Sequence, residues 1–482
     1  MNLGLLSHEW LVVALALAVL LIDLWLPPLA KRNLGYLAAL GLAGVLIYSF
    51  AGVVVVPDQT QFAFGQMYAL DPLALFFKRF FLLSTIIVLL MSVEFADSIE
   101  GGIGEYYALI LFALAGMLFA ASANHFALLF VSLELITVTF YVLTSFQRAR
   151  VTSLEAGVKY LVIGALSTSF TVFGIALVYG ISRKLDFAEL SGVAGQFSGN
   201  KIFLLGLLLV MVGLGFKIAA FPFQIWAPDV YQGAPSPTTA FLAVGSKAAG
   251  FVLLLRVLFL AVPDVTAQWS KLLIAVSAIT ILYGNLCALP QRNLKRLFGY
   301  SSIAHAGYML LGVAALSAAG QSAVLYYLSG YLFTVLGAFT VICLVMTQVE
   351  GEDITALAGL HHRAPLLALT MTLAMISLGG IPPLAGFFGK FLLFKAALAR
   401  GAAEPAYYWL VAVAIAGVII SLYYYFGVVR AIFWGKEAGL SPIPTSAPIR
   451  IALYGCVAGM LILGLFPNWL VEVTKASVKV LH

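Results

Sequence analysis

The chain has 482 residues, of which 63% are hydrophobic and 10% are charged. A soluble domain carries about a quarter charged residues, so this composition excludes an ordinary soluble protein. Runs of about 20 apolar residues recur along the sequence, and each is long enough to cross a hydrocarbon core of about 30 Å. The net charge is +6, but no dense run of basic residues is longer than QRNLKR at 291–296. A nucleic-acid partner is therefore not expected. These features predict an all-α polytopic membrane protein.

The apolar stretches and the breaks between them predict about fourteen membrane spans. No basic segment precedes the first span, so we expect a retained helix and not a cleaved signal peptide. Lysines and arginines in the short loops favour both termini outside, because positively charged loops stay inside. The expected spans are 9–27, 34–56, 72–94, 105–121, 126–146, 158–180, 202–226, 238–261, 272–290, 297–317, 322–347, 366–399, 407–433 and 449–471.

Two of these spans are interrupted by glycine and proline. The span 202–226 contains Pro222, and the span 366–399 contains SLGGIPPLAGFFGKF at 377–391. Proline removes a hydrogen-bond donor and clashes with the preceding turn, so both helices are expected to be discontinuous. Paired discontinuous helices are typical of inverted-repeat transporters with an ion site near the midplane. We therefore expect three N-terminal helices in 1–95, five-helix repeats in 104–261 and 272–433, the second inverted, and a C-terminal helix in 449–482.

Ionisable residues inside these spans are candidates for function, because an intramembrane charge costs several kcal/mol. Lys217 precedes Trp226 by nine residues, about 13 Å along a helix, which is too far for its amine to reach the membrane surface. Glu134 lies near the centre of its span. We expect Lys159, about two turns into the next span, to be its partner in a switchable pair or, alternatively, in a structural clamp.

Three more residues extend this set into the second half of the chain. Lys247 has only small neighbours, which leave room for water or for a close helix, and Lys390 follows the second break as Lys217 accompanies the first. His305 is interpreted either as part of the same set or as a satisfied core histidine. Ionisable residues expected nearer helix ends or outer surfaces are Asp23, Glu94, Arg256 and Lys395, and Asp229 is expected to cap a loop.

Amines and a carboxylate at one depth, with hydroxyls and a histidine between them, predict a proton relay. Its expected members are Glu134, Lys159, Lys217, Lys247, His305 and Lys390. The three cysteines stand singly without metal-site spacing, and no GxGxxG, Walker or CxxC motif occurs. No cofactor or metal is therefore expected on this chain.

Several segments resemble the subunit N family of the bacterial proton-translocating NADH–quinone oxidoreductase, respiratory complex I. The resemblance covers essentially the whole chain and is carried by LELITVTFYVL, SLEAGVKY, GLGFKIAAFPFQIWAPDVYQGAP, QRNLKRLFGYSSIAHAGYML and GIPPLAGFFGKF. It implies that Glu134 is the helix-five glutamate and that Lys217 is the lysine of the broken seventh helix. It also implies that Lys247 is the connecting lysine and Lys390 the lysine of the broken twelfth helix.

The resemblance further implies a bacterial inner-membrane location with periplasmic termini, and subunits M and K as neighbours. NADH, FMN, Fe–S clusters and quinone would be bound by other subunits, whose redox chemistry would supply the energy. Two alternatives stay open: an Mrp-like secondary cation/proton antiporter, and a scaffold whose charges have no role in transport. A relay made mostly of lysine repels cations, which disfavours a dedicated Na⁺ site.

Overall fold

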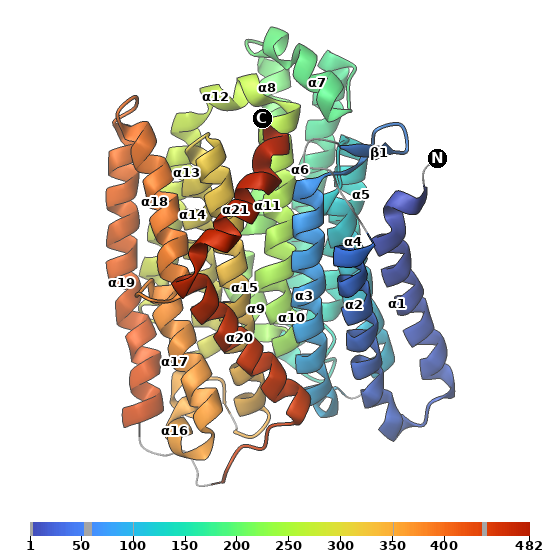
Figure 1. Cartoon of the computed structure of the whole chain (residues 1–482), viewed down its shortest axis with the longest axis vertical. Coiled ribbons are helices and arrows are strands. Elements are labelled where there is room, and N and C mark those ends of the chain that lie inside the picture. The colour runs from blue at the N-terminus through green and yellow to red at the C-terminus, as the bar shows by residue number, and fades with distance from the viewer. Residues whose placement is uncertain (1–2, 53–59, 100, 350, 436–440) are drawn as a thin grey trace.

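The computed structural model describes residues 3–52, 60–99, 101–349, 351–435 and 441–482, which form one bundle of helices (Figure 1). The only sheet in these ranges is a short hairpin of β1 (Gln61–Ala63) and β2 (Tyr68–Leu70), with Gln61 opposite Leu70. The α-helices are α1 (Ser7–Trp25), α2 (Leu34–Ala51), α3 (Pro72–Glu94), α4 (Ile103–Ala121), α5 (Phe126–Thr144), α6 (Val151–Ser182), α7 (Phe187–Ala194), α8 (Lys201–Ile218), α9 (Trp226–Gly233), α10 (Ser236–Phe241), α11 (Lys247–Arg256), α12 (Pro263–Gln268), α13 (Ser270–Ala288), α14 (Leu294–Ala314), α15 (Ala318–Met346), α16 (Leu360–Arg363), α17 (Pro365–Gly379), α18 (Ala385–Gly401), α19 (Ala406–Trp434), α20 (Ala447–Leu465) and α21 (Pro467–Val478).

Shorter turns complete the chain. Two π-helical turns, η5 (Leu242–Ser246) and η6 (Val257–Ala261), flank α11. The 3₁₀ turns are η1 (Leu3–Leu6), η2 (Pro28–Asn33), η3 (Ala96–Ser98), η4 (Gly195–Phe197), η7 (Ile354–Leu357) and η8 (Lys479–Leu481).

Within the described ranges, 13 helices are long and apolar enough to cross a membrane. The remaining expected span is α17 with α18, which is broken where Gly380 takes the left-handed conformation at φ +81°. The span at 202–226 breaks in the same way, because α8 ends at Ile218 and Ala219 has φ +59°. The predicted all-α membrane fold and both discontinuous helices are confirmed.

Some expected boundaries are wrong. The helix expected at 158–180 begins at Val151 and runs for 32 residues, about 48 Å. The last span ends at Leu465, because the helix breaks at Phe466 and Pro467 starts a separate helix, α21. The C-terminal segment 449–482 therefore holds two helices where one was expected. The end of the expected span 34–56 includes residues 53–56, which lie outside the described residues.

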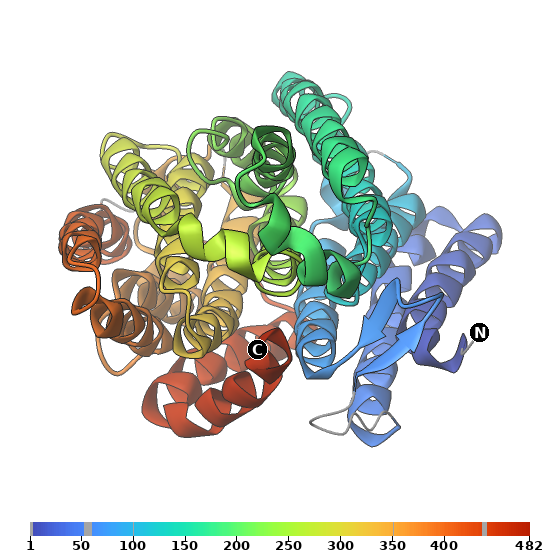
Figure 2. The same cartoon turned by 90° about the horizontal axis from the view of Figure 1, so that it is seen from above.

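The C-terminal helices lie across both halves of the bundle. α20 contacts α3 as well as α15, α17 and α18. Seen from above, α20 and α21 lie between the N-terminal helices and the helices near the end of the second half (Figure 2). α1 begins and α21 ends at the same end of the bundle, which agrees with the expectation that both termini share one side (Figure 1).

Burial differs sharply between inner and outer helices. The apolar stretches of α14 and of the α10–α11 segment are buried along their whole length, whereas most of the stretch in α6 faces outward. The outward faces carry large apolar side chains, such as Trp25, Trp409 and Tyr423, each about three-quarters exposed. Lipid would cover those faces, while polar groups on α11 and α14 are enclosed by protein.

Candidate functional site

Lys217 lies at the end of α8, one residue before the helix terminates. Its side chain is buried at 2% exposure, and Nζ donates a hydrogen bond to Thr137 Oγ1 of α5 at 3.0 Å. The carbonyl of Phe216, in the last turn of α8, accepts from the Trp226 indole at 3.0 Å and from the main-chain N–H of Ala219 at 3.1 Å. The burial expected for Lys217 is confirmed. The reason differs, because the helix does not continue to Trp226 and surrounding protein encloses the amine.

Glu134 lies on α5 one turn before Thr137, so its carboxylate and the Lys217 amine belong to the same neighbourhood. Glu134 Oε1 accepts a hydrogen bond from Thr168 Oγ1 of α6 at 2.7 Å. The side chain is half-buried. A carboxylate with one hydroxyl partner keeps acceptor sites for water or for an approaching ammonium.

The expected pair of Glu134 with Lys159 is wrong. Lys159 Nζ lies 2.7 Å from Glu155 on its own helix and 2.7 Å from Asp229 on α9. Thr168 is the α6 residue that faces Glu134, and it follows Lys159 by nine residues, about 13 Å along the axis. Lys159 is therefore too far along α6 to reach Glu134.

Asp229 is not a loop cap. It lies in the first turn of α9, where its carboxylate pairs with Lys159 of α6 and with Arg296 of α14. Sequence reasoning missed this link, because its partners are 70 and 67 residues away along the chain. The link ties the segment after the first break to both halves of the bundle.

Lys247 follows the π turn η5 directly and is buried at 2% exposure. Its Nζ donates to the main-chain oxygen and to the hydroxyl of Ser302 on α14. The same hydroxyl is hydrogen-bonded to Tyr231 Oη at 3.0 Å and accepts from Tyr331 Oη at 3.2 Å. Single π turns occur frequently at functional sites. Ser302 thus joins the Lys247 amine to two phenols that sequence reasoning did not single out.

His305 lies one turn after Ser302 on α14 and is also buried. Nδ1 is hydrogen-bonded to Tyr327 Oη, and Nε2 lies 2.9 Å from Tyr425 Oη. Both ring nitrogens therefore have phenol partners, and Tyr425 Oη is also bonded to Ser301 Oγ. The geometry fits both interpretations left open for this histidine, since the partners that satisfy the ring also form a hydrogen-bonded chain.

Lys390 lies in the second turn of α18, after the second break. It is 4% exposed, and its Nζ donates to the carbonyl of Leu378 at 2.7 Å. That carbonyl belongs to the last turn of α17, directly before the break at Gly380. The amine also lies 4.9 Å from the ring centroid of Tyr308 on α14. Both broken helices therefore place a buried lysine beside their interrupted backbone.

The buried groups are connected through close helix contacts. A Cβ built on Gly250 of α11 would lie 3.3 Å from Lys217 Cβ, so the helix that carries Lys247 touches Lys217 directly. The ring centroids of His305 and Tyr331 are 5.2 Å apart, and Tyr331 shares Ser302 with Lys247. These contacts place five of the six expected relay residues along one buried polar zone from α5 to α18. Lys159 lies apart from that zone.

Arg256 is not at a lipid-facing position, contrary to expectation. It is 0% exposed, with Nη2 2.8 Å from Asp71 Oδ2 of the segment preceding α3 and Nε 2.9 Å from the Ala121 carbonyl. Asp23 and Glu94 do lie near helix ends, where they pair with Lys31 and Arg32. Lys395 is exposed, as expected.

No group of three or more His, Cys, Asp or Glu side chains in the described ranges is arranged to hold a metal ion. Cys287, Cys343 and Cys456 are unpaired there. The buried zone brings together amines, a carboxylate, hydroxyls and an imidazole, which are groups that can donate and accept protons.

A family model described as "NADH:quinone oxidoreductase/Mrp antiporter, TM" matches residues 123–422. That range includes Glu134, Lys217, Lys247 and Lys390 and spans more than half of the chain. The chain is thus an antiporter-like membrane protein with many helical spans.

Similar proteins of known name specify the family within this class. The chain is 40% identical to the NADH-quinone oxidoreductase subunit N of Trichlorobacter lovleyi, covering 100% of this chain and 98% of the relative. It is 38% identical to the subunit N of Moorella thermoacetica, with coverages of 97% and 96%. The chain belongs to the NADH-quinone oxidoreductase subunit N family.

Solved structures agree with this assignment. A chain of respiratory complex I from Thermus thermophilus with bound aureothin is 34% identical, with a TM-score of 0.80 and coverages of 97% and 99%. A chain of the Mrp complex from Dietzia is 21% identical with a TM-score of 0.83, a likeness of fold alone.

Proposed function

We propose that the chain is a membrane-arm subunit of a proton-translocating NADH–quinone oxidoreductase and that it moves protons through its buried zone. The observation that supports this most is the repeated pairing of a broken helix with an enclosed lysine, Lys217 at the first break and Lys390 at the second. An enclosed amine releases or takes up a proton when its surroundings change, because burial penalises its charged form.

In this proposal Glu134 supplies the negative charge beside Lys217, and Lys247 connects the two halves through Ser302. His305 and its phenols bridge toward Lys390. Lys159 acts indirectly, by holding Asp229 and with it the helix after the first break. Reduction of quinone in other subunits provides the energy. This chain binds none of the redox cofactors.

The proposed surroundings are a bacterial cell membrane, with both termini on the periplasmic side and other membrane subunits alongside, of which subunits M and K are the proposed neighbours. Full-length relatedness to subunit N proteins supports the complex, and the shared end of α1 and α21 supports the common side of the termini.

The decisive experiment uses inverted membrane vesicles that contain the assembled oxidoreductase. Lys217→Ala and Lys390→Ala should abolish most NADH-driven acidification per assembled complex, while Lys395→Ala, which changes an exposed lysine of α18, should leave it intact. Normal acidification by both Lys217→Ala and Lys390→Ala would reject the relay and favour a scaffold.

The Mrp-like alternative rests on fold and on the shared family model. It predicts that the purified chain alone exchanges Na⁺ for H⁺ in liposomes. Absence of exchange, together with acidification by the assembled complex, would exclude it.

A further inference from the structure

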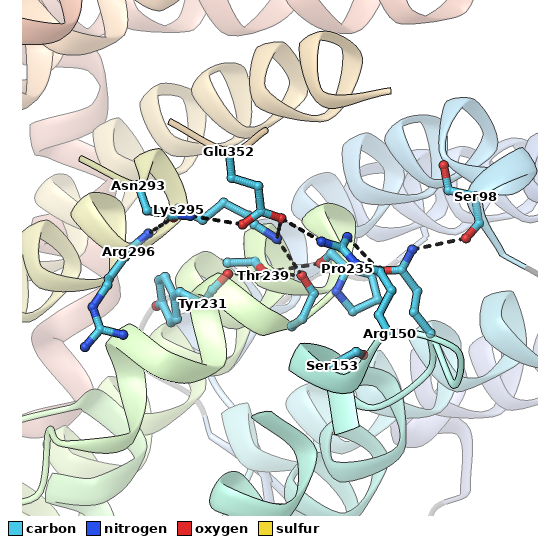
Figure 3. Close-up of polar contacts among 12 residues, drawn as sticks. Ser98, Arg150, Ser153, Tyr231, Pro235, Thr239, Asn293, Lys295, Arg296 and Glu352 are labelled. Atoms are coloured by element: carbon cyan, nitrogen blue, oxygen red, sulfur yellow. Dashed lines mark hydrogen bonds and ion pairs between the residues drawn. The ribbon is translucent and has the colours of Figure 1, made fainter. Parts of the chain in front are cut away.

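A second charged group lies outside the buried zone, around Glu352 (Figure 3). Glu352 Oε1 lies 3.1 Å from Arg150 Nη2 and 3.0 Å from Lys295 Nζ. Its other oxygen accepts from Asn293 Nδ2 at 3.1 Å. Arg150 immediately precedes α6, whereas Lys295 lies in the first turn of α14, so one carboxylate joins the two halves.

These side chains face a cavity of about 370 Å³, which can hold several water molecules. The cavity lies at the end of the bundle where α6 and α14 begin, opposite the end of α21. Lys295 is 2% exposed and Glu352 is 18% exposed, so the carboxylate meets water while the amine is enclosed behind it. Polar and charged residues of its lining are Ser98, Gln147, Arg150, Ser236, Lys295, Thr347, Gln348 and Glu352.

Polar atoms continue inward from Lys295. Its Nζ donates to the carbonyl of Ala234 at 3.1 Å. Thr239 Oγ1 contacts the same carbonyl at 3.4 Å and the carbonyl of Tyr231 at 3.2 Å. A carbonyl accepts a hydrogen bond but has no proton to pass on, so water must carry a proton along this outer part.

The inner part consists of side chains that do carry exchangeable protons. Tyr231 Oη is hydrogen-bonded to Ser302 Oγ at 3.0 Å, and Ser302 Oγ is bonded to Lys247 Nζ. Tyr231, Ser302 and Lys247 are all buried, at 2% exposure or less. The two parts meet at Tyr231, whose main-chain carbonyl belongs to the outer part and whose hydroxyl begins the inner part that ends at Lys247.

We propose that Glu352, with Lys295 behind it, is the proton-uptake site that supplies Lys247. This inference rests on the proposed function of the buried zone. Water in the cavity protonates the Glu352 carboxylate, and the carboxylic acid passes that proton to water on the inner side. That water protonates Tyr231 Oη as the phenol gives its own proton to Ser302 Oγ. Ser302 gives its proton to the neutral Lys247 amine, which becomes an ammonium, and Glu352 returns to a carboxylate.

A structural clamp is the competing interpretation, because Glu352 also ties the segment after α15 to two helices. The first test compares Glu352→Gln, which keeps size and hydrogen bonding, with Asp353→Asn, which changes the adjacent acid that has no side-chain capping bond. In inverted vesicles, Glu352→Gln should lower NADH-driven acidification per assembled complex by at least about tenfold. Asp353→Asn should change nothing, and Glu352→Asp should restore part of the rate. Unchanged acidification in Glu352→Gln would overturn the proposal.

The second test separates proton uptake from clamping. Glu352→Ala leaves space beside the cavity for a small anion, and the outward-facing cytoplasmic side of inverted vesicles admits it. Formate can bind the Arg150 and Lys295 charges and carry a proton, whereas nitrate can bind them but stays unprotonated. We expect formate to restore acidification in Glu352→Ala and nitrate to have no effect, with both salts neutral toward the unmodified complex. Equal restoration by both anions, or by neither, would overturn the proposal.

Failure of the broader function is recognised separately, in the same vesicles. Lys390 does not line the cavity beside Glu352 and belongs to the α18 end of the buried zone. If Lys390→Ala and Lys217→Ala acidify normally, the relay itself fails. If Lys217→Ala and Lys390→Ala lose acidification while Glu352→Gln keeps it, the relay stands and only the uptake site is rejected.

Discussion

Lys159 Nζ lies 2.7 Å from Asp229 Oδ2, an ion pair that joins the long helix α6 to the short helix α9 after the first break. Asp229 also holds Arg296 of α14. The position of α9 relative to Lys217 therefore depends on charges contributed by both halves of the bundle. Lys159 is therefore paired away from Glu134, and we expect substitutions of the two residues to affect acidification independently.

Double-mutant cycles distinguish these roles. We expect the effect of Lys159→Met on acidification to be non-additive with that of Asp229→Asn, because each variant breaks the same pair. It should add to the effect of Glu134→Gln, which removes a group elsewhere. The stability change for Lys159→Met should stay below about 1 kcal/mol, since the Lys159 side chain is 41% exposed. Additivity with Asp229→Asn would contradict the assigned pair.

Gly250 permits the close crossing of α8 and α11. A Cβ at this position would lie 2.7 Å from Ile218 Cγ2, so Gly250→Val should destabilise the bundle by about 1–3 kcal/mol through overpacking. It should also impair acidification, because the displaced atoms adjoin Lys217. Thermal unfolding and vesicle assays check both effects. The control is Gly180→Ala on α6, where an added Cβ meets nothing within 4 Å. Equal stability of the two variants would contradict the close crossing.

Gly380 combines a left-handed backbone with proximity to Lys390. Its φ is +81°, and an added Cβ would lie 2.9 Å from Lys390 Cδ. Gly380→Ala should therefore cost about 1–2 kcal/mol for the backbone alone and should lower acidification by displacing the amine. Gly427→Ala on α19, where space is open, is the matched control. A Gly380→Ala variant with unchanged unfolding temperature and acidification would show that the break tolerates a side chain.

The Arg256–Asp71 pair is fully buried and joins α11 to the segment that precedes α3. Arg256→Met leaves the Asp71 charge enclosed without its cation, which should destabilise the protein by about 3–5 kcal/mol. Combining it with Asp71→Asn should recover part of that loss. Arg183→Met, which alters an exposed arginine at the end of α6, should have little effect. A destabilisation of equal size in the Arg183 and Arg256 variants would contradict the assignment.

Glu352 predicts a pH dependence of stability. Burial raises the pKa of its carboxyl, but Lys295, Asn293 and Arg150 outweigh burial and hold the pKa below its usual value. A depressed folded-state pKa contributes stability above the unfolded-state pKa, and that contribution is lost as the pH falls through the folded-state pKa. The unfolding temperature should therefore fall more in the unmodified protein than in Glu352→Gln as the pH is lowered from about 6 to well below the ordinary carboxyl pKa of about 4.3. Parallel curves would contradict the pKa shift.

Local chemistry in the sequence was sufficient to predict the two breaks and the burial of their lysines. Gly379, Gly380 and the prolines at 382 and 383 exclude a continuous helix whatever surrounds them. A lysine inside an apolar stretch must be enclosed by protein, because its charge is costly in lipid. The partner of Lys159 was not predictable in this way. Which residue an amine reaches depends on the rotation and offset of neighbouring helices, and these follow from packing across the whole bundle.

The burial of Arg256 was also not predictable from the local sequence. Its position near the end of an apolar stretch is typical of a side chain that reaches the membrane surface. Its partner Asp71 lies 185 residues earlier, and nothing in the local sequence indicates that Asp71 and the end of α4 enclose it. The uptake cavity was likewise not predictable, because Arg150, Lys295 and Glu352 meet only through the ends of three helices.

The π turn η5 has a consequence for how this chain tolerates changes in length. A π turn holds one more residue than an α-helical turn, so it amounts to a single-residue insertion within the α10–α11 span. Removing one residue from 242–246 would restore ordinary winding and rotate α10 by about 100° relative to α11. Lys247 could then face Ser302 only if α10 lost its present neighbours. The π turn therefore fixes the orientation of the lysine relative to the preceding helix, and this span should not tolerate the loss of one residue at that point.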